Sequence, residues 1–415
     1  MDDARVVRPD RDQHLLMPTF LDALLPADHE ARMVWAATGR LDLSAFRDAI
    51  QARGTTAGRA AIDPRLLVAL WLYATKEGVG GGRALERLCR HHDAYRWLCG
   101  GISVSYHTLN DFRVAHEKAL DDLLTQMLAA LVYHDVVTVT RISQDGTRVR
   151  ASAGKSSFRR RGKLEALQAE MSARIATLKQ ELGASENGPQ RTLREAKRRL
   201  TCVDRALKTL DELQSAKAAQ KNKPSKSRAP RASTTDSTAR IMRMGDGGYR
   251  PAYNVQFAVD VSSRAIVGVD VCNKGSDANE SRPMREQVEA RTGRRVAEHL
   301  LDGGYVNLKE IERAQTAGVT IYAPVPKPKK AEIDPHAPRK GDGPGVIAWR
   351  ARMATEEAKT IYRQRAATVE TANADAKAHR GLRQFAVRGL TKVKCVSLWF
   401  ALTYNLTRFA EYFQT

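Results

Sequence analysis

The order of apolar and polar residues divides the chain into a helical first third and a later region of strands and helices. From Ala31 to Tyr133, apolar residues recur at three- and four-residue steps, as in Pro64–Ala74, which indicates helices that pack by one face. Asp63 supplies a helix N-cap in front of a first-turn proline. We therefore expect residues 1–134 to form an all-helical N-terminal domain that binds DNA.

Beyond this region, short apolar runs and two-residue alternation predict strands. The run Val136–Ile142 predicts the first strand. The expected later elements are a hairpin of Tyr253–Asp260 and Ala265–Val271, a helix at Met284–Arg291, a strand at Val296–Leu301, a helix at Lys309–Ala317, a strand at Val319–Pro324 and a long helix after Pro344. This order is that of an RNase H-like mixed sheet flanked by helices. We predict an α/β catalytic core whose first part is 135–154 and whose remainder, with C-terminal helices, is 236–415.

Residues 155–235 interrupt the predicted sheet. Two series of leucine-rich positions recur at helical spacing, from Leu164 to Leu182 and from Leu193 to Leu213, with a turn at Gly183–Pro189 between them. This pattern predicts an inserted antiparallel helical hairpin with basic exposed faces. A plain coiled-coil spacer and an arm that grips DNA are both compatible with it. Ser215–Thr235 is rich in Lys, Ser, Ala and Pro, which predicts a flexible basic linker.

The charge of the chain favours a polyanionic partner. Lys and Arg number 68 against 47 Asp and Glu, a net charge of +21, as expected for a protein that binds nucleic acid. A solvated basic surface is the alternative. The five scattered cysteines form no zinc or disulfide pattern, so we expect reduced thiols. No apolar run is long enough to span a membrane and the N-terminus is polar, so a cytoplasmic location is expected.

One segment of the helical region is a candidate for DNA contact. Ser103–Arg113 follows two glycines and opens with small hydroxyl residues, so it predicts a helix that starts near Ser105. As the second helix of a helix-turn-helix, it would offer Tyr106, Thr108 and Arg113 to DNA. A helical packing unit without a DNA contact fits the pattern equally well.

Three acidic residues are candidates for a metal site. Asp145 and Asp302 each follow an apolar run, which favours carboxylates held at strand ends by a rigid sheet. Glu370 lies in the alanine-rich helical segment Tyr362–Lys377. Carboxylate oxygens are the ligands that Mg²⁺ prefers, and two such ions are suited to phosphoryl transfer. Asp-Gly is also a common turn dipeptide, so Asp145 and Asp302 each have a structural alternative.

The helix that carries Glu370 combines several charges on one face. At about 100° per residue, Tyr362, Arg365, Glu370, Asn373 and Lys377 share a face of roughly 140°. The face combines a carboxylate, two cations and an aromatic ring, and a phosphate backbone could approach it. An exposed, salt-bridged helix face is the alternative.

The spacing Tyr362-x2-Arg365-x4-Glu370-x6-Lys377 resembles the Tyr-Arg-Glu-Lys signature of bacterial insertion-sequence transposases of the DDE class. Other segments are similar to the same family: Leu41–Ser44, Tyr106–Arg113, Asp145–Thr147, Gly247–Gln256, Leu301–Tyr305, His379–Arg383 and Val387–Leu390. The resemblance implies that Asp145, Asp302 and Glu370 bind two Mg²⁺ ions, for which Mn²⁺ can substitute. It also implies that Tyr362, Arg365 and Lys377 contact DNA near the cleaved strand.

The resemblance implies an enzyme that cleaves DNA at the ends of an insertion sequence and joins the freed ends to target DNA. Its partners would be the double-stranded terminal inverted repeats, the target DNA and a second copy of the chain in a synaptic homodimer. Such a protein is expected in the bacterial cytoplasm, at the nucleoid. A catalytically inactive, domesticated DNA-binding protein and an RNase H-like nuclease without strand transfer are the alternatives.

Overall fold

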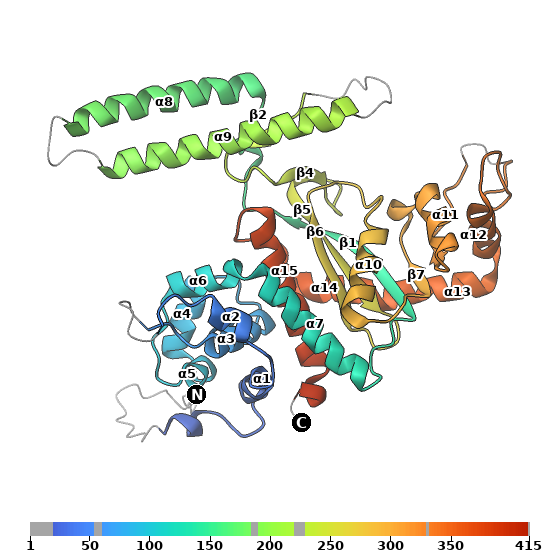
Figure 1. The fold of residues 1–415 in the computed structure, drawn as a ribbon, viewed down its shortest axis with the longest axis horizontal. Coiled ribbons are helices and arrows are strands. Elements are labelled where there is room, and N and C mark those ends of the chain that lie inside the picture. The colour runs from blue at the N-terminus through green and yellow to red at the C-terminus, as the bar shows by residue number, and fades with distance from the viewer. Residues whose placement is uncertain (1–19, 54–59, 184–189, 220–228, 329–331, 414–415) are drawn as a thin grey trace, which may run out of the picture.

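The computed structural model describes residues 20–53, 60–183, 190–219, 229–328 and 332–413, and it contains a helical N-terminal region, a mixed sheet and a long helical hairpin (Figure 1). The helical region was predicted from the apolar periodicity, and this prediction is confirmed. Its elements are the 3-10 helix η1 (Leu21–Leu24), α1 (Glu30–Thr38), α2 (Ser44–Asp48), α3 (Pro64–Lys76), α4 (Gly82–His91), α5 (Asp93–Cys99), α6 (Tyr106–Ala115) and α7 (Glu117–Tyr133). The Asp63 side chain caps α3 by accepting a hydrogen bond from the Arg65 amide at 2.9 Å, as its position predicts.

A six-stranded sheet forms the second half of the molecule. Its strands are β1 (Arg141–Arg150), β4 (Arg240–Arg243), β5 (Tyr249–Asp260), β6 (Ile266–Cys272), β7 (Glu298–Leu300) and β8 (Thr320–Tyr322). The strand order is β4-β5-β1-β7-β8, and β6 pairs with β5 as well. β1 runs antiparallel to β5 and parallel to β7, which is parallel to β8. This sheet with its helices is the predicted RNase H-like fold.

The helices around the sheet are α10 (Ser281–Thr292), α11 (Leu308–Thr316), α12 (Pro344–Ala354), α13 (Glu356–Arg365), the π-helical turn η4 (Ala366–Glu370), α14 (Thr371–Ala378) and α15 (Leu390–Arg408), with the 3-10 turns η3 (Gly303–Tyr305) and η5 (Ala410–Phe413). α15 lies between the helical region and the sheet and contacts α3, α6, α7 and β6. The Trp399 indole donates to the Arg113 carbonyl on one side, and Asn405 exchanges two hydrogen bonds with Ile266 on the other. Consequently the helical region and the sheet share one continuous apolar core.

The first strand does not lie where the sequence pattern predicted it. β1 begins at Arg141, so most of the apolar run that starts at Val136 precedes it. Val137 and Val139 are buried, but Val139 has a φ of 49°, which is incompatible with a strand. Its amide donates to a carboxylate oxygen of Asp260 at 3.0 Å. The run is apolar because a connecting segment fills the core here.

The inserted hairpin consists of α8 (Arg161–Gly183) and α9 (Gln190–Ala219), which lie side by side away from the sheet (Figure 1). At its foot are the 3-10 turn η2 (Lys155–Ser157) and the paired strands β2 (Phe158–Arg159) and β3 (Ala232–Ser233). The expected flexible linker at Ser215–Thr235 is corrected in part. α9 continues to Ala219 and β3 is paired, whereas 220–228 lie outside the described residues.

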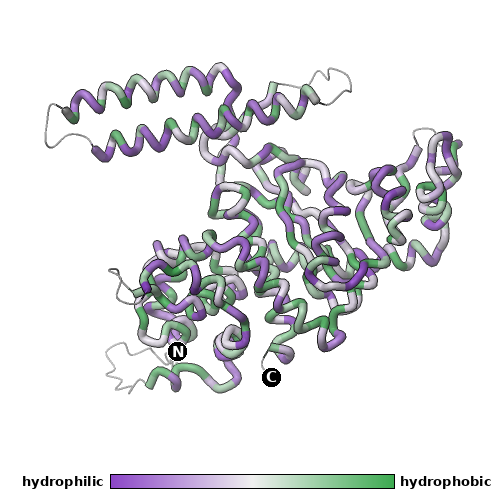
Figure 2. Tube along the Cα trace, viewed as in Figure 1, coloured by the Kyte–Doolittle hydropathy of each residue, from purple (hydrophilic) through white to green (hydrophobic). Residues whose placement is uncertain are grey.

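The apolar positions of the hairpin gather at its foot and on the inner faces of its helices, and hydrophilic residues dominate its outer surface (Figure 2). All five cysteines are free, and each is buried or half-buried. Over the described part of the chain, no helix combines the length and the apolar character needed to cross a membrane.

Candidate active site

The parallel pairing of β1 with β7 brings Asp145 and Asp302 together. Ser143 of β1 is paired with Leu300 of β7, and the β1–β7 ladder ends there. Asp145 and Asp302 each lie two residues beyond this pair, on adjacent chains that run in the same direction. Asp302 follows the end of its strand, as predicted. Asp145 does not, because β1 continues to Arg150 in antiparallel pairing with β5.

Asp145 is therefore a mid-strand residue at the point where β7 no longer covers β1. The Asp-Gly turn that the dipeptide allows does not form, because Asp145 and Gly146 both pair with β5. The Asp302 carboxylate accepts a hydrogen bond from the Gly304 amide at 2.7 Å, which fixes the turn η3 after β7. Two carboxylates from two rigid strands thus approach the same edge of the sheet.

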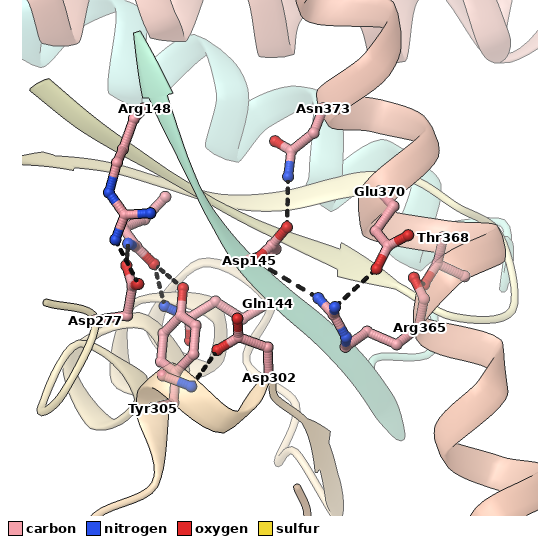
Figure 3. A network of polar contacts seen from close by, with 12 residues as sticks. Gln144, Asp145, Arg148, Asp277, Asp302, Tyr305, Arg365, Thr368, Glu370 and Asn373 are labelled. Carbon is pink, nitrogen blue, oxygen red and sulfur yellow. Dashed lines mark hydrogen bonds and ion pairs between the residues drawn. The ribbon is translucent and has the colours of Figure 1, made fainter. Parts of the chain in front are cut away.

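Glu370 reaches this edge from the helix on one face of the sheet, through the π turn η4 (Figure 3). In an α-helix, residues five apart are separated by about 140° around the axis, whereas a π turn stacks residues i and i+5. As a result the Arg365 guanidinium pairs with the Glu370 carboxylate at 2.7 Å. The ideal helix face drawn from the sequence kept these two side chains at its opposite edges, and the π turn corrects that expectation.

Arg365 also links the helix to the sheet. Its guanidinium lies 3.5 Å from the Asp145 carboxylate, and Asn373 donates to the other oxygen of Asp145 at 3.0 Å. Burial raises the pKa of Asp145 to about 6, although the Arg365 charge opposes this shift and the nearby Asp302 carboxylate adds to it. Asp145 is thus held between an amide, a guanidinium and a second carboxylate.

A buried polar network lies on the opposite face of β1 (Figure 3). Gln256 of β5 accepts hydrogen bonds from Gln144 at 2.9 Å and from the Tyr305 hydroxyl, and donates to Asp277 at 2.8 Å. Asn254 donates to the same oxygen of Asp277 at 2.6 Å. Because Tyr305 lies in the turn that Asp302 begins, the network ties this turn to β1 and β5.

Gly146 occupies the centre of this network. A Cβ at this position would lie 2.3 Å from Asp277 Oδ1, 2.4 Å from Gln256 Nε2 and 2.7 Å from Asn254 Oδ1. Real Cβ atoms do not approach other atoms so closely, so the network requires glycine here. The neighbouring Asp145 depends on this packing for the position of its backbone.

The sequence reading did not assign this network, although the sequence carries a signal for it. Asn254 and Gln256 are amides at alternate positions of β5, where almost every other residue from Ala252 to Val259 is apolar. Alternate positions of a strand share one face, and a buried polar pair needs partners. The pattern therefore marks a polar buried face, but it does not identify Asp277 as the partner.

The donor chemistry at the site suits Mg²⁺, because Asp145, Asp302 and Glu370 offer carboxylate oxygens. Two buried polar atoms beside Asp145, Arg365 Nη1 and Asn373 Oδ1, have no hydrogen-bond partner among the described atoms, so the site keeps unused binding capacity. The described side chains do not include three acidic, histidine or cysteine ligands close enough to share an ion. Arg365 is the reason, because it lies between Glu370 and Asp145.

The other expected DNA contacts on this helix lie near the acids. Tyr362 is half-buried against the core formed by β7, β8 and the helices α11 to α13, and the Arg365 guanidinium lies 6.0 Å from its ring centre. Lys377 is half-buried, and burial lowers its pKa while Asp145 opposes the shift. A cation whose charged form is penalised by burial gains from a nearby anion.

The expected contacts of the N-terminal region fall into two groups. Ser105 caps α6 by accepting from the Thr108 amide at 3.3 Å, so the helix begins where the sequence predicted. Thr108 and Tyr106 are half-buried at this end. Arg113, in contrast, is buried, donates to the Gly80 carbonyl and stacks over a tryptophan ring at 4.6 Å. This expectation of DNA contact is corrected, because the Arg113 charge is used within the protein.

Comparison with known protein families gave two matches. Residues 19–115 match a transposase domain (DUF772), and residues 346–410 match a transposase DDE domain. Both are transposase domains. The second match includes Tyr362, Arg365, Glu370 and Lys377, whereas Asp145 and Asp302 lie outside both matches. No curated protein and no solved structure gave a match.

The two transposase matches support a role in DNA transposition, and such a role implies that the protein binds DNA. The match to a DDE domain implies a transposase enzyme, and enzymes of this class generally use a divalent metal. The RNase H-like sheet and the positions of the acids at its edge are in keeping with these inferences.

Proposed function

We propose that the protein is the transposase of a bacterial insertion sequence, with Asp145, Asp302 and Glu370 as its metal-binding acids. The observation that supports this most strongly is the parallel register, in which Asp145 and Asp302 both lie two residues beyond the Ser143–Leu300 pair. Glu370 is linked to Asp145 through Arg365. Three residues far apart in sequence thus approach one edge of the sheet, as a two-metal site requires.

The proposed reaction has two steps at one site. In cleavage, a water oxygen attacks a phosphorus at the element end, the P–O3′ bond breaks, and the products are a 3′-hydroxyl and a 5′-phosphate. In strand transfer, that 3′-hydroxyl attacks a target phosphorus and displaces a target 3′-oxygen, which is protonated. Bound Mg²⁺ would supply positive charge to the attacking and leaving oxygens.

The chain's own residues orient the DNA and hold the acids. The Gln256 network keeps β1 and the Asp302 turn in place, and Asn373 orients the Asp145 carboxylate. We assign the phosphate contacts near the cleaved strand to Tyr362, Arg365 and Lys377, the remaining members of the Tyr-Arg-Glu-Lys signature. When DNA engages Arg365, Glu370 would be released to join Asp145 and Asp302 around the metal.

Tyr106 and Thr108 at the start of α6 are proposed as further DNA contacts of the N-terminal region. Arg83 stacks over the Tyr106 ring at 4.9 Å and adds positive charge beside it. Two element ends must be brought together, so we propose a homodimer that holds both terminal inverted repeats and the target.

The experiment that tests this proposal compares Asp302→Asn with the wild-type chain. Purified protein is incubated with Mg²⁺ and a supercoiled plasmid that carries the element ends. We expect Mg²⁺-dependent cleavage by the wild type and none by Asp302→Asn, with unchanged DNA affinity. The matched control is Glu357→Gln, which neutralises an exposed acid on α13, and it should cleave normally. Cleavage by Asp302→Asn would remove this residue from the site.

The products also separate a transposase from a nuclease of the same fold. A transposase joins the freed 3′-hydroxyl to target DNA, so labelled element ends should appear in target-sized products. Cleavage without such products would favour the nuclease.

A further inference from the structure

The α8–α9 hairpin has no part in the site described above, yet it carries an uninterrupted row of cations. Five basic residues of α9 form what we call the α9 stripe: Arg191, Arg194, Arg198, Arg205 and Lys208. All five are exposed. At about 100° per residue they fall within an arc of roughly 100°, and they extend along about 26 Å of the helix.

The stripe lies on the side of α9 that faces away from α8. The apolar residues of α9 that are buried in the hairpin, Ala196, Val203, Ala206 and Leu210, lie on the opposite side of the same helix. In Figure 2 the hairpin stands clear of the sheet, with hydrophilic positions along its outer surface. The cations of the stripe are therefore accessible along its whole length.

The acids of α9 are mostly engaged inside the hairpin. Asp211 pairs with Arg161 of α8, Asp204 accepts from Gln168 of α8 at 2.7 Å, and Glu195 pairs with Arg199 at 2.7 Å. Among the described residues, no carboxylate lies within ion-pair distance of a stripe cation, and Arg194 has only an amide partner at 3.4 Å. The stripe thus carries positive charge that the protein itself does not neutralise.

The foot of the stripe is continuous with the body of the protein. Arg205 lines a recess of about 190 Å³ together with Thr235 and Arg388. Arg388 belongs to the segment before α15, and its guanidinium donates to the Ser152 carbonyl near the end of β1. A ligand that follows the stripe therefore reaches a further cation close to the catalytic sheet.

We infer that the hairpin is a DNA-binding arm and that the α9 stripe follows the phosphate backbone of duplex DNA. The inference rests on the proposed function and adds a second DNA contact, outside the catalytic site. A straight row of about 26 Å matches seven to eight base pairs at 3.4 Å per pair. Exposed, unneutralised cations in a row suit a regular polyanion, and contacts to phosphates require no particular base sequence.

The test compares two variants of the full chain with the same change in charge. The first carries Arg191→Gln, Arg194→Gln and Arg198→Gln in the stripe. The control carries Lys163→Gln, Arg174→Gln and Lys179→Gln, which neutralise three exposed cations of α8. Both sets lie on the hairpin, so a general loss of net charge affects them equally. Circular dichroism during thermal unfolding checks that both remain folded.

Affinity for a duplex of about 40 base pairs is measured at several salt concentrations between 50 and 200 mM. Loss of three phosphate contacts should reduce the salt slope by about 3 for the stripe variant. The wild-type affinity should then fall about 40-fold more than that of the variant over this range. The α8 control should keep most of the wild-type slope.

Equal slopes for wild type and stripe variant, or equal losses in both variants, would overturn the inference. A stripe variant that loses affinity for duplex RNA but not for duplex DNA would show that the partner is wrong. If the wild type itself binds no DNA, the proposed function fails as well. If the wild type binds and the stripe variant binds equally, only the arm is refuted.

Discussion

Gly146 provides a direct test of how tightly the structure beside Asp145 is packed. In Gly146→Ala, the new methyl group would lie 2.3 Å from Asp277 Oδ1 and 2.4 Å from Gln256 Nε2. Both atoms belong to buried residues and already form hydrogen bonds, so neither can move without losing a partner. Overpacking of this kind costs about 1–3 kcal/mol, and weakening one hydrogen bond to a charged group costs about 1.5–3 kcal/mol.

The same substitution also removes chain entropy from the unfolded state, which stabilises the fold by about 0.4–1 kcal/mol. The expected net effect of Gly146→Ala is therefore a loss of roughly 3 kcal/mol in the free energy of unfolding. Gly154→Ala is the matched control. Its φ of −87° and ψ of 154° suit alanine, and the nearest atom to its Cβ would lie 3.5 Å away. This control should gain up to about 1 kcal/mol.

The measurement is urea-induced unfolding of both variants, followed by circular dichroism. The reasoning predicts changes of opposite sign for one chemical change at two glycines. If the free energy of unfolding of Gly146→Ala stays within about 0.5 kcal/mol of the wild type, the packing described for β1 is wrong.

Two further predictions concern buried cationic and titratable groups. Arg113→Met should lower the free energy of unfolding by about 2–4 kcal/mol, because it removes the contact with Trp71 and the hydrogen bond to Gly80; DNA affinity of the folded variant, measured by anisotropy, should not change, and a selective loss would restore Arg113 as a DNA contact. His299 is fully buried, and burial lowers its pKa from 6.5 to about 3, so the unfolded chain takes up a proton in this window while the folded chain does not. The free energy of unfolding should fall as pH drops below 6.5, by about 1.4 kcal/mol per unit for this residue, and urea unfolding of His299→Leu should lack this component; parallel pH profiles would contradict the assignment.

Much of the fold could be predicted because its signals are local. Helical periodicity located the N-terminal helices and the hairpin, and alternation located β5 and β6. The first strand was misplaced because an apolar run does not distinguish a strand from a buried connection. Val139, with its positive φ, fills the core without forming a strand.

The site depends on geometry that local patterns do not encode. Asp302 was placed correctly, because β7 ends just before it. Asp145 was recognised as a candidate, but its position beside Asp302 follows from the register of β1 and β7, which joins segments more than 150 residues apart. An ideal helix could not anticipate the π turn that pairs Arg365 with Glu370. Arg113 was misassigned because the sequence of α6 does not reveal that α3 covers it.

The short ladder of β2 and β3 has a consequence for how the chain can change over time. Phe158 pairs with Ser233, so the polypeptide leaves the catalytic sheet and comes back at a single fixed crossing. Lengthening or shortening the arm beyond this crossing leaves the register of β1 and β5 untouched, and the entropy of closing a longer excursion grows only slowly with its length. Accessory DNA-contacting segments of different reach could therefore be exchanged here while the chemistry at the sheet edge stays the same.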